Sequence, residues 1–140
     1  MKEATPLPVV VESIDMKNAP DEVYAAIHMH NNLMRAERLP SDSAIKLAEW
    51  TAQYQHGPPF VDIHTWIVWS EDKTAVIARG EVIFVNMEEN QHLGQMRIDV
   101  LPEYRCKGIG HHLLTCIIDT TKKESRRLLI SNTYGRVPAG

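Results

Sequence analysis

The sequence has few cysteines, no long apolar run and no excess of basic residues. Its two cysteines, Cys106 and Cys116, are too few for a disulfide framework or a thiolate metal site, and they agree with free thiols in a reducing compartment. No segment approaches the roughly 18 apolar residues that cross a bilayer, and the N-terminus lacks the apolar segment of a secretory signal. We therefore expect a cytoplasmic protein with no membrane partner.

Charge and histidine spacing argue against two further classes. The formal net charge of −3 gives no support for long-range attraction to nucleic acid or to an anionic membrane. His28 and His30 would lie on different faces of a helix, and the adjacent His111 and His112 also diverge. Because the sequence contains no H-E-x-x-H motif and no Cys/His cluster, we expect no metal site. Any anion that the protein binds must be held locally.

Strand and helix patterns alternate along a chain of 140 residues, which is the size of one domain. β-Branched and aromatic runs predict five strands, at Val9–Ile14, Asp62–Ser70, Thr74–Asn86, Gln95–Leu101 and Leu128–Ser131. A first helix is predicted between Pro20 and Pro40, on the helical spacing of Val23, Ala26, Ile27, His30, Leu33 and Met34. A second helix is predicted after a cap at Ser41 or Ser43, with one face formed by Ala44, Leu47, Ala48 and Thr51.

The order of these elements is strand, helix, helix, three strands, helix and strand. Three consecutive strands with short turns predict an antiparallel meander, and the final strand-helix-strand unit predicts a parallel pair with a crossover helix. The sequence therefore indicates a single α+β (or α/β) domain over residues 1–140, with a mixed, mostly antiparallel sheet.

The stretch "VLPEYRCKGIGHHLL", residues 100–114, joins the fourth predicted strand to the third helix. A helix N-terminus leaves backbone N–H groups unpaired and carries partial positive charge. Gly108 and Gly110 let a ligand approach the backbone, and Arg105 and Lys107 add formal charge. Two interpretations follow: a tight turn with two chance basic residues, or a local phosphate site. The spacing fits neither the P-loop nor the dinucleotide fingerprint.

The element order and this motif together resemble the GNAT superfamily of acyl-CoA-dependent N-acyltransferases. The family pattern [QR]-x-x-G-x-[GA] is met by residues 105–110, and Val100, Pro102 and Tyr104 match its usual lead-in. The resemblance implies that acetyl-CoA is the co-substrate and that an amine is the acceptor. In that family the turn holds the CoA pyrophosphate, and the edge of the preceding strand pairs with the pantetheine arm. The residues implied for these roles are Ile98, Asp99, Val100, Arg105, Cys106, Lys107, Gly108, Ile109, Gly110 and His111.

The catalytic residues are less well defined by the resemblance. Relatives usually protonate the leaving thiolate with a Tyr on a helix beyond the last strand predicted here, and two further strands follow. We therefore expect residues 1–140 to be the N-terminal part of such a fold, from a longer or tandem protein. The carboxylates to test as general base are Glu81 and Asp99. The alternative is that they form cross-strand ion pairs with Arg79 and Arg97.

Three functions are compatible with these observations. The first is an N-acetyltransferase acting on a small molecule or a protein amine. The second is a GNAT-like domain that binds acyl-CoA without turnover, and the third is a domain that serves assembly. Because the final strand at Leu128–Ser131 has one predicted neighbour, we also expect a homodimer through its open edge.

Overall fold

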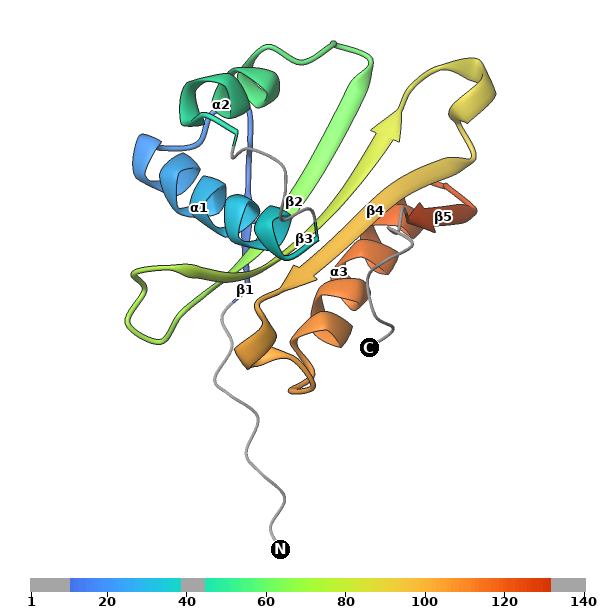
Figure 1. Cartoon of the computed structure of the whole chain (residues 1–140). Coiled ribbons are helices and arrows are strands. Elements are labelled where there is room, and N and C mark those ends of the chain that lie inside the picture. Colours follow the sequence, from blue (N-terminus) through green and yellow to red (C-terminus); the bar gives the residue numbers. More distant parts are fainter. Residues whose placement is uncertain (1–10, 39–44, 132–140) are drawn as a thin grey trace, which may run out of the picture.

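The computed structural model describes residues 11–38 and 45–131. These residues form five strands, β1 (Val11–Ile14), β2 (Val61–Trp69), β3 (Val76–Val85), β4 (Leu93–Val100) and β5 (Leu128–Ser131). The helices are α1 (Asp21–Arg38), α2 (Leu47–Gln55) and α3 (Ile109–Lys123), with short 3-10 turns η1 (Glu88–Asn90) and η2 (Pro102–Tyr104). The predicted order of elements is confirmed (Figure 1).

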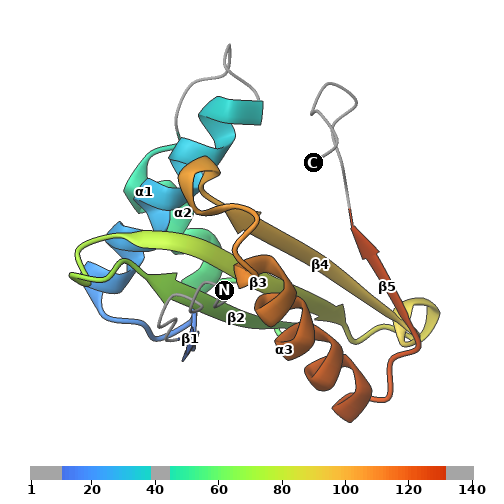
Figure 2. The same ribbon diagram turned by 90° about the horizontal axis from the view of Figure 1, so that it is seen from below.

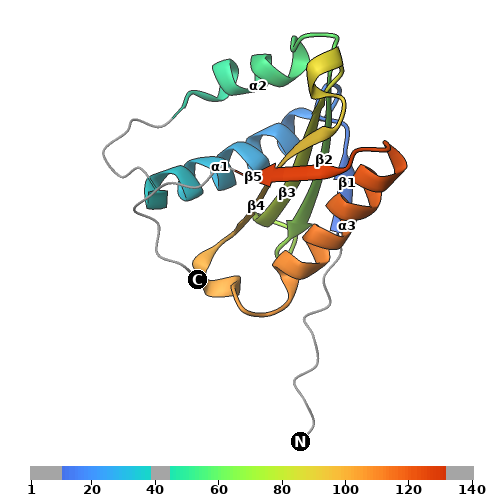
Figure 3. The same cartoon turned by 90° about the vertical axis from the view of Figure 1, so that its right-hand side faces the viewer.

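The strands form one mixed sheet in the order β1-β2-β3-β4-β5. The pairs from β1 to β4 are antiparallel, and β4 pairs with β5 in parallel after the crossover through α3. Figure 3 shows the sheet between α1 and α2 on one side and α3 on the other. The mixed, mostly antiparallel α+β sheet predicted from the sequence is therefore confirmed.

Alternation along β3 decides which side chains face which layer. Gly80 faces α3, where a Cβ atom would meet the Cβ of Leu113 at 3.1 Å. Val82 packs on the same side with Ile117 of α3. Glu81 points the other way and reaches α2, since it accepts a hydrogen bond from Tyr54. The face of the sheet under α1 and α2 is thus the one that carries ionisable side chains.

The second helix differs from its prediction in position and in its buried face. It begins at Leu47, after Lys46, which makes no side-chain cap; Ser41 and Ser43 lie outside the described residues. Leu47 is 41% exposed, whereas Trp50 is 4% exposed. Burial follows Trp50 and Tyr54 instead of the predicted apolar stripe, because large aromatic rings remove more apolar area from water than Leu47 and two small residues do.

Candidate active site

The turn between β4 and α3 has the backbone conformation that its glycine predicts. Cys106 and Gly108 have positive φ angles of 64° and 86°, and Gly108 is the left-handed residue immediately before α3. A Cβ atom on Gly108 would have no neighbour within 4 Å, so glycine is favoured here by the left-handed backbone and not by a lack of space. The space beside Gly108 is open to a ligand. This turn is the predicted pyrophosphate site.

The amides of this turn are available to an anion. No amide from residue 106 to residue 111 donates to a backbone carbonyl of the described chain outside regular elements. The first turn of a helix has no intrahelical acceptors for its N–H groups, so the amides of Ile109, Gly110 and His111 also point outward. Lys107 is exposed beside them. The arrangement suits a phosphate group.

Arg105 makes contacts that the sequence did not suggest. Its Nε donates to the carbonyl of Val100 at 2.9 Å, and its two terminal nitrogens donate to the carboxylate of Glu37 at 3.0 and 2.6 Å. Glu37 lies on α1, 68 residues earlier in the chain. The side chain of Arg105 therefore connects the turn to α1 and to the end of β4.

The pairing of β4 with β5 covers only part of β4. The register runs from Leu93 opposite Leu128 to Met96 opposite Ser131. β5 ends there (Figure 2), so the side of β4 that faces away from β3 has no strand beside it at Ile98–Val100 among residues 11–38 and 45–131. Asp99, also predicted at this edge, is paired with Arg79 of β3, and its side chain turns to the α1 face.

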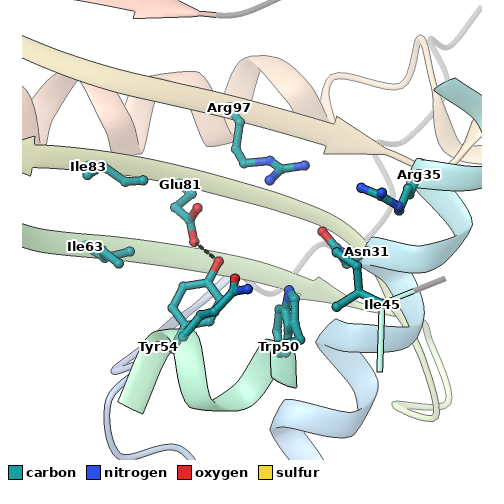
Figure 4. Close-up of a pocket in the computed structure, with 10 residues that line it drawn as sticks. Asn31, Arg35, Ile45, Trp50, Tyr54, Ile63, Glu81, Ile83 and Arg97 are labelled. Atoms are coloured by element: carbon teal, nitrogen blue, oxygen red, sulfur yellow. Dashed lines mark hydrogen bonds between the residues drawn. The ribbon is translucent and has the colours of Figure 1, made fainter. Parts of the chain in front are cut away.

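A cavity of about 370 Å³ lies on the α1 and α2 face of the sheet. This size falls within the roughly 300–1,000 Å³ range of small-molecule sites. Its walls come from α1, α2 with the residue Ile45 before it, and three adjacent strands (Figure 4). The lining residues are Asn31, Arg35, Ile45, Trp50, Gln53, Tyr54, Ile63, Glu81, Ile83 and Arg97.

Glu81 is the carboxylate that lines this cavity. Its Oε2 accepts hydrogen bonds from Tyr54 Oη at 2.9 Å and from Thr65 Oγ1 at 3.0 Å. Glu81 is 3% exposed, yet it lies on the cavity wall. Among the described residues no hydrogen bond is donated to Oε1. Two hydroxyl donors thus orient one oxygen and leave the other for a ligand.

Tyr54 and Trp50 form an aromatic wall beside Glu81. Their rings meet edge to face with centroids 5.0 Å apart. Burial, followed by the negative charge of Glu81, raises the pKa of Tyr54 well above its ordinary value of 10.0. The phenol therefore stays protonated at neutral pH and donates to Glu81. Sequence reasoning missed both aromatic residues; their i, i+4 spacing was the available signal.

Asp99 has a different environment from that of Glu81. Its Oδ2 accepts from Arg97 Nε at 2.9 Å and lies 4.0 Å from Arg79 Nη2 on the neighbouring strand. Asp99 is 1% exposed and is not part of the cavity lining. The ion-pair alternative therefore describes Asp99, whereas the hydrogen bonds of Glu81 go to Tyr54 and Thr65.

No group of three or more His, Cys, Asp or Glu residues is placed to hold a metal ion within residues 11–38 and 45–131. In the same part of the chain, none of the helices has the length and apolar character required to traverse a bilayer.

Comparison with known proteins identifies relatives of this fold. The model of the acetyltransferase (GNAT) family matches residues 24–134. A tandem GNAT protein from the clavulanic acid biosynthesis pathway, solved without acetyl-CoA, superposes with a TM-score of 0.70 at 17% identity. The match covers 94% of this chain, which spans only 39% of the length of that protein. No curated protein matches the sequence.

Two other structures share the fold at low identity. The protein yncA from Salmonella typhimurium, solved with its cofactor acetyl-CoA, has a TM-score of 0.67 at 15% identity, over 88% of this chain and 68% of that one. An aminoglycoside acetyltransferase from an uncultured soil metagenomic sample, in complex with sisomicin, has a TM-score of 0.64 at 8% identity, over 91% and 78%.

Proposed function

Because the chain belongs to the acetyltransferase (GNAT) family, we propose that it transfers an acetyl group from acetyl-CoA to an amine of a small molecule. The observation that carries the proposal is the position of Glu81. Its carboxylate is oriented by two hydroxyl groups on the wall of a small-molecule cavity, on the strand next to the open β4 edge.

The open turn suits the pyrophosphate of acetyl-CoA, and the open strand edge suits its pantetheine arm. The pyrophosphate would accept hydrogen bonds from the amides of residues 106–111, at the positive end of α3. The pantetheine arm would pair with the free edge at Ile98–Val100, as an added strand does. This placement brings the thioester to the part of β4 just past the end of β5, next to Arg97, whose side chain lines the cavity.

Glu81 supplies the base for the transfer. Its Oε1 takes a proton from the acceptor amine, directly or through water, and the amine nitrogen attacks the thioester carbon. The C–S bond then breaks, an amide forms, and CoA leaves as a thiolate that receives a proton from solvent. Tyr54 and Thr65 both donate to Oε2, which orients the carboxylate and leaves Oε1 for this step. Asp99, between two guanidinium groups, has a structural role in this scheme.

A second candidate function is acyl-CoA binding without turnover, as one domain of a larger assembly. This candidate is supported by the similarity to the tandem GNAT protein, of whose length this chain spans 39%. The two functions differ in what Glu81 does, because a binding domain needs the turn but not a base.

The CoA site is tested by titrating the chain with acetyl-CoA in a calorimeter. Gly108→Asp should abolish detectable binding, because it places a negative charge where the pyrophosphate would lie and strains a left-handed position. Gly108→Ala is the matched control, since it carries the strain without the charge and should weaken binding less. Equal affinity in the wild type and Gly108→Asp would contradict the placement.

Cysteine labelling gives an independent readout of the same site. Cys106 is exposed on the turn, whereas Cys116 is half-buried and burial raises its thiol pKa. A thiol reagent should therefore modify Cys106 first. Acetyl-CoA should slow that reaction, as measured by mass spectrometry, and leave Cys116 unaffected.

Glu81→Gln separates catalysis from binding. The amide has the size of the carboxylate but is a poor base, so release of free CoA in the presence of an amine should fall by roughly 10²–10⁴-fold. Acetyl-CoA affinity should stay unchanged, because Glu81 lies on the other face of the sheet from α3. Full turnover by Glu81→Gln would remove Glu81 as the base; no turnover by the wild type, with CoA bound, would favour the binding domain.

A further inference from the structure

The cavity on the α1 and α2 face has a polar end and an apolar end, with Glu81 between them. We propose that the cavity takes a primary amine carried on a short aliphatic chain, and that this amine is the acetyl acceptor. The inference rests on the proposed function, since it takes the cavity for the acceptor site and names the chemical class of the acceptor.

The polar end of the cavity lies under α1. Asn31 of α1 accepts a hydrogen bond from Arg79 at 3.0 Å, and Arg79 comes two residues before Glu81 on β3. Arg35, one helical turn after Asn31, lines the same end, and Figure 4 shows both of these α1 side chains on one side of Glu81. Amide and guanidinium groups at this end favour water over an aliphatic chain.

The apolar end is formed by two isoleucines on adjacent strands. Ile63 and Ile83 are directly opposite in the register of β2 and β3, which places their Cβ atoms roughly 5 Å apart. Ile83 comes two residues after Glu81, and Figure 4 shows the two isoleucines on the side of Glu81 away from Arg35. Both are half-buried and line the cavity, so a bound aliphatic chain would remove their remaining apolar surface from water.

The carboxylate of Glu81 fixes the amine end of such a ligand. Tyr54 and Thr65 both donate to Oε2, and among the described residues no hydrogen bond is donated to Oε1. An amine that donates to Oε1 has β4 on one side, where the thioester would lie, and the isoleucines of β2 and β3 on the other. The reacting nitrogen therefore faces the co-substrate, and the aliphatic chain points away from it.

The spacing along β3 limits the length of the aliphatic chain. Residues two apart on a strand are separated by roughly 6.8 Å, so a chain that reaches from Glu81 past Ile83 has about four to six carbon atoms. The cavity volume of about 370 Å³ accommodates an amine of that size. A polar group at the far end of the chain would be placed against Ile63 and Ile83 and would lose its hydrogen bonds to water.

The experiment measures CoA release with n-alkylamines from methylamine to octylamine, which have nearly equal basicity. We expect kcat/KM to rise about 2- to 4-fold per methylene, up to a chain of about four to six carbons, and then to level off. 3-Aminopropanol has the same number of heavy atoms as butylamine. It should react with a kcat/KM at least ~5-fold lower, because its hydroxyl group would be desolvated against the isoleucines.

Two substitutions at Ile83 connect this dependence to the cavity. Ile83→Ser should flatten the dependence on chain length by raising KM for the longer amines, whereas Ile83→Val keeps an apolar side chain and should retain the dependence. Ile130→Ser, the same change at an exposed position of β5, is the matched control outside the cavity and should leave the dependence intact. If Ile83→Ser does not fold, the amine series with the wild type still tests the inference.

Calorimetry with the same amines, in the absence of acetyl-CoA, gives a readout that does not depend on turnover. Affinity that rises with chain length and is lost in Ile83→Ser, without any acetyl transfer, supports an aliphatic amine as the ligand of the cavity and contradicts only the proposed function. Equal kcat/KM for butylamine and 3-aminopropanol, or for all chain lengths, overturns the inference and leaves the proposed function standing. If the alkylamines neither bind nor react, the inference is wrong.

Discussion

The carboxylate of Glu81 is oriented by two residues that are far from it in the sequence. Thr65 is its partner in the β2–β3 register, and Tyr54 comes from α2. Both donate to the same oxygen, so the carboxylate is held in one orientation with its second oxygen available. The cavity therefore contains a carboxylate that is nearly buried but still satisfied by hydrogen bonds.

Tyr54→Phe should lower kcat by a few-fold without changing acetyl-CoA affinity. The substitution removes one of the two hydroxyl donors that orient the carboxylate of Glu81, so the proposed base is held less firmly. An assay of CoA release measures kcat. Tyr104→Phe, which changes a tyrosine outside the cavity, is the control, and an unchanged kcat in Tyr54→Phe would mean that the phenol does not position the base.

The same substitution should change stability at alkaline pH. Burial and Glu81 raise the pKa of Tyr54 in the folded chain, whereas in the unfolded chain it ionises near 10.0. Above that pH the unfolded chain has released a proton that the folded chain keeps, so the stabilisation is complete below pH 10 and falls as the pH rises. Between about pH 10 and 12, the free energy of unfolding should decline less steeply in Tyr54→Phe. Urea unfolding at a series of pH values measures this free energy. An equally steep decline in the wild type and in Tyr54→Phe would contradict the raised pKa of Tyr54.

Helix α1 contacts both parts of the site. Asn31 and Arg35 line the cavity, and Glu37, near the end of the same helix, holds Arg105 of the turn between β4 and α3. The Arg105–Glu37 pair is 40% exposed on each side. Such exposed pairs contribute roughly 0–1 kcal/mol to stability, so the pair matters more for the shape of the turn than for the free energy of unfolding.

Glu37→Gln should weaken acetyl-CoA binding by a few-fold while changing stability by less than about 1 kcal/mol. Arg105 would lose its bidentate partner, and the turn would have to be ordered when the ligand binds. Calorimetry and urea unfolding on the same preparation separate the two effects. Tighter binding in Glu37→Gln would mean instead that the ion pair withholds the guanidinium from the phosphate.

At the scale of the whole molecule, the sheet has a free edge at β5. The side chains of Leu128 and Ile130 are 48% and 39% exposed there, and β5 pairs only with β4 among the described strands. An exposed apolar edge is a template for pairing with another chain. The homodimer expected from the sequence therefore stays a prediction.

Ile130→Lys should reduce association of the chain, because a lysine on an edge strand opposes pairing with a second copy. Light scattering over a range of concentrations measures the oligomeric state. Leu33→Lys, which adds the same charge at an exposed position of α1, should leave association unchanged. A wild-type chain that stays monomeric at every concentration would contradict the prediction.

The order of the elements and the backbone conformation of the turn at residues 105–111 could both be predicted from the sequence. Both depend on local chemistry: periodicity sets strand and helix, and Gly108 before an apolar helix allows a left-handed residue and leaves amides unpaired. Residues 105–111 are contiguous, so no long-range contact is needed to bring them together.

The cavity on the α1 and α2 face could not be predicted from the sequence. It gathers Arg35, Tyr54, Glu81 and Arg97 from four elements, and it distinguishes Glu81 from Asp99, which looked equivalent in the sequence. Which way α2 turns its aromatic residues, and which carboxylate meets a guanidinium group, depends on packing between segments far apart in the chain. Packing of that kind leaves no periodic signal in the sequence, because burial and charge pairing are properties of the assembled layers.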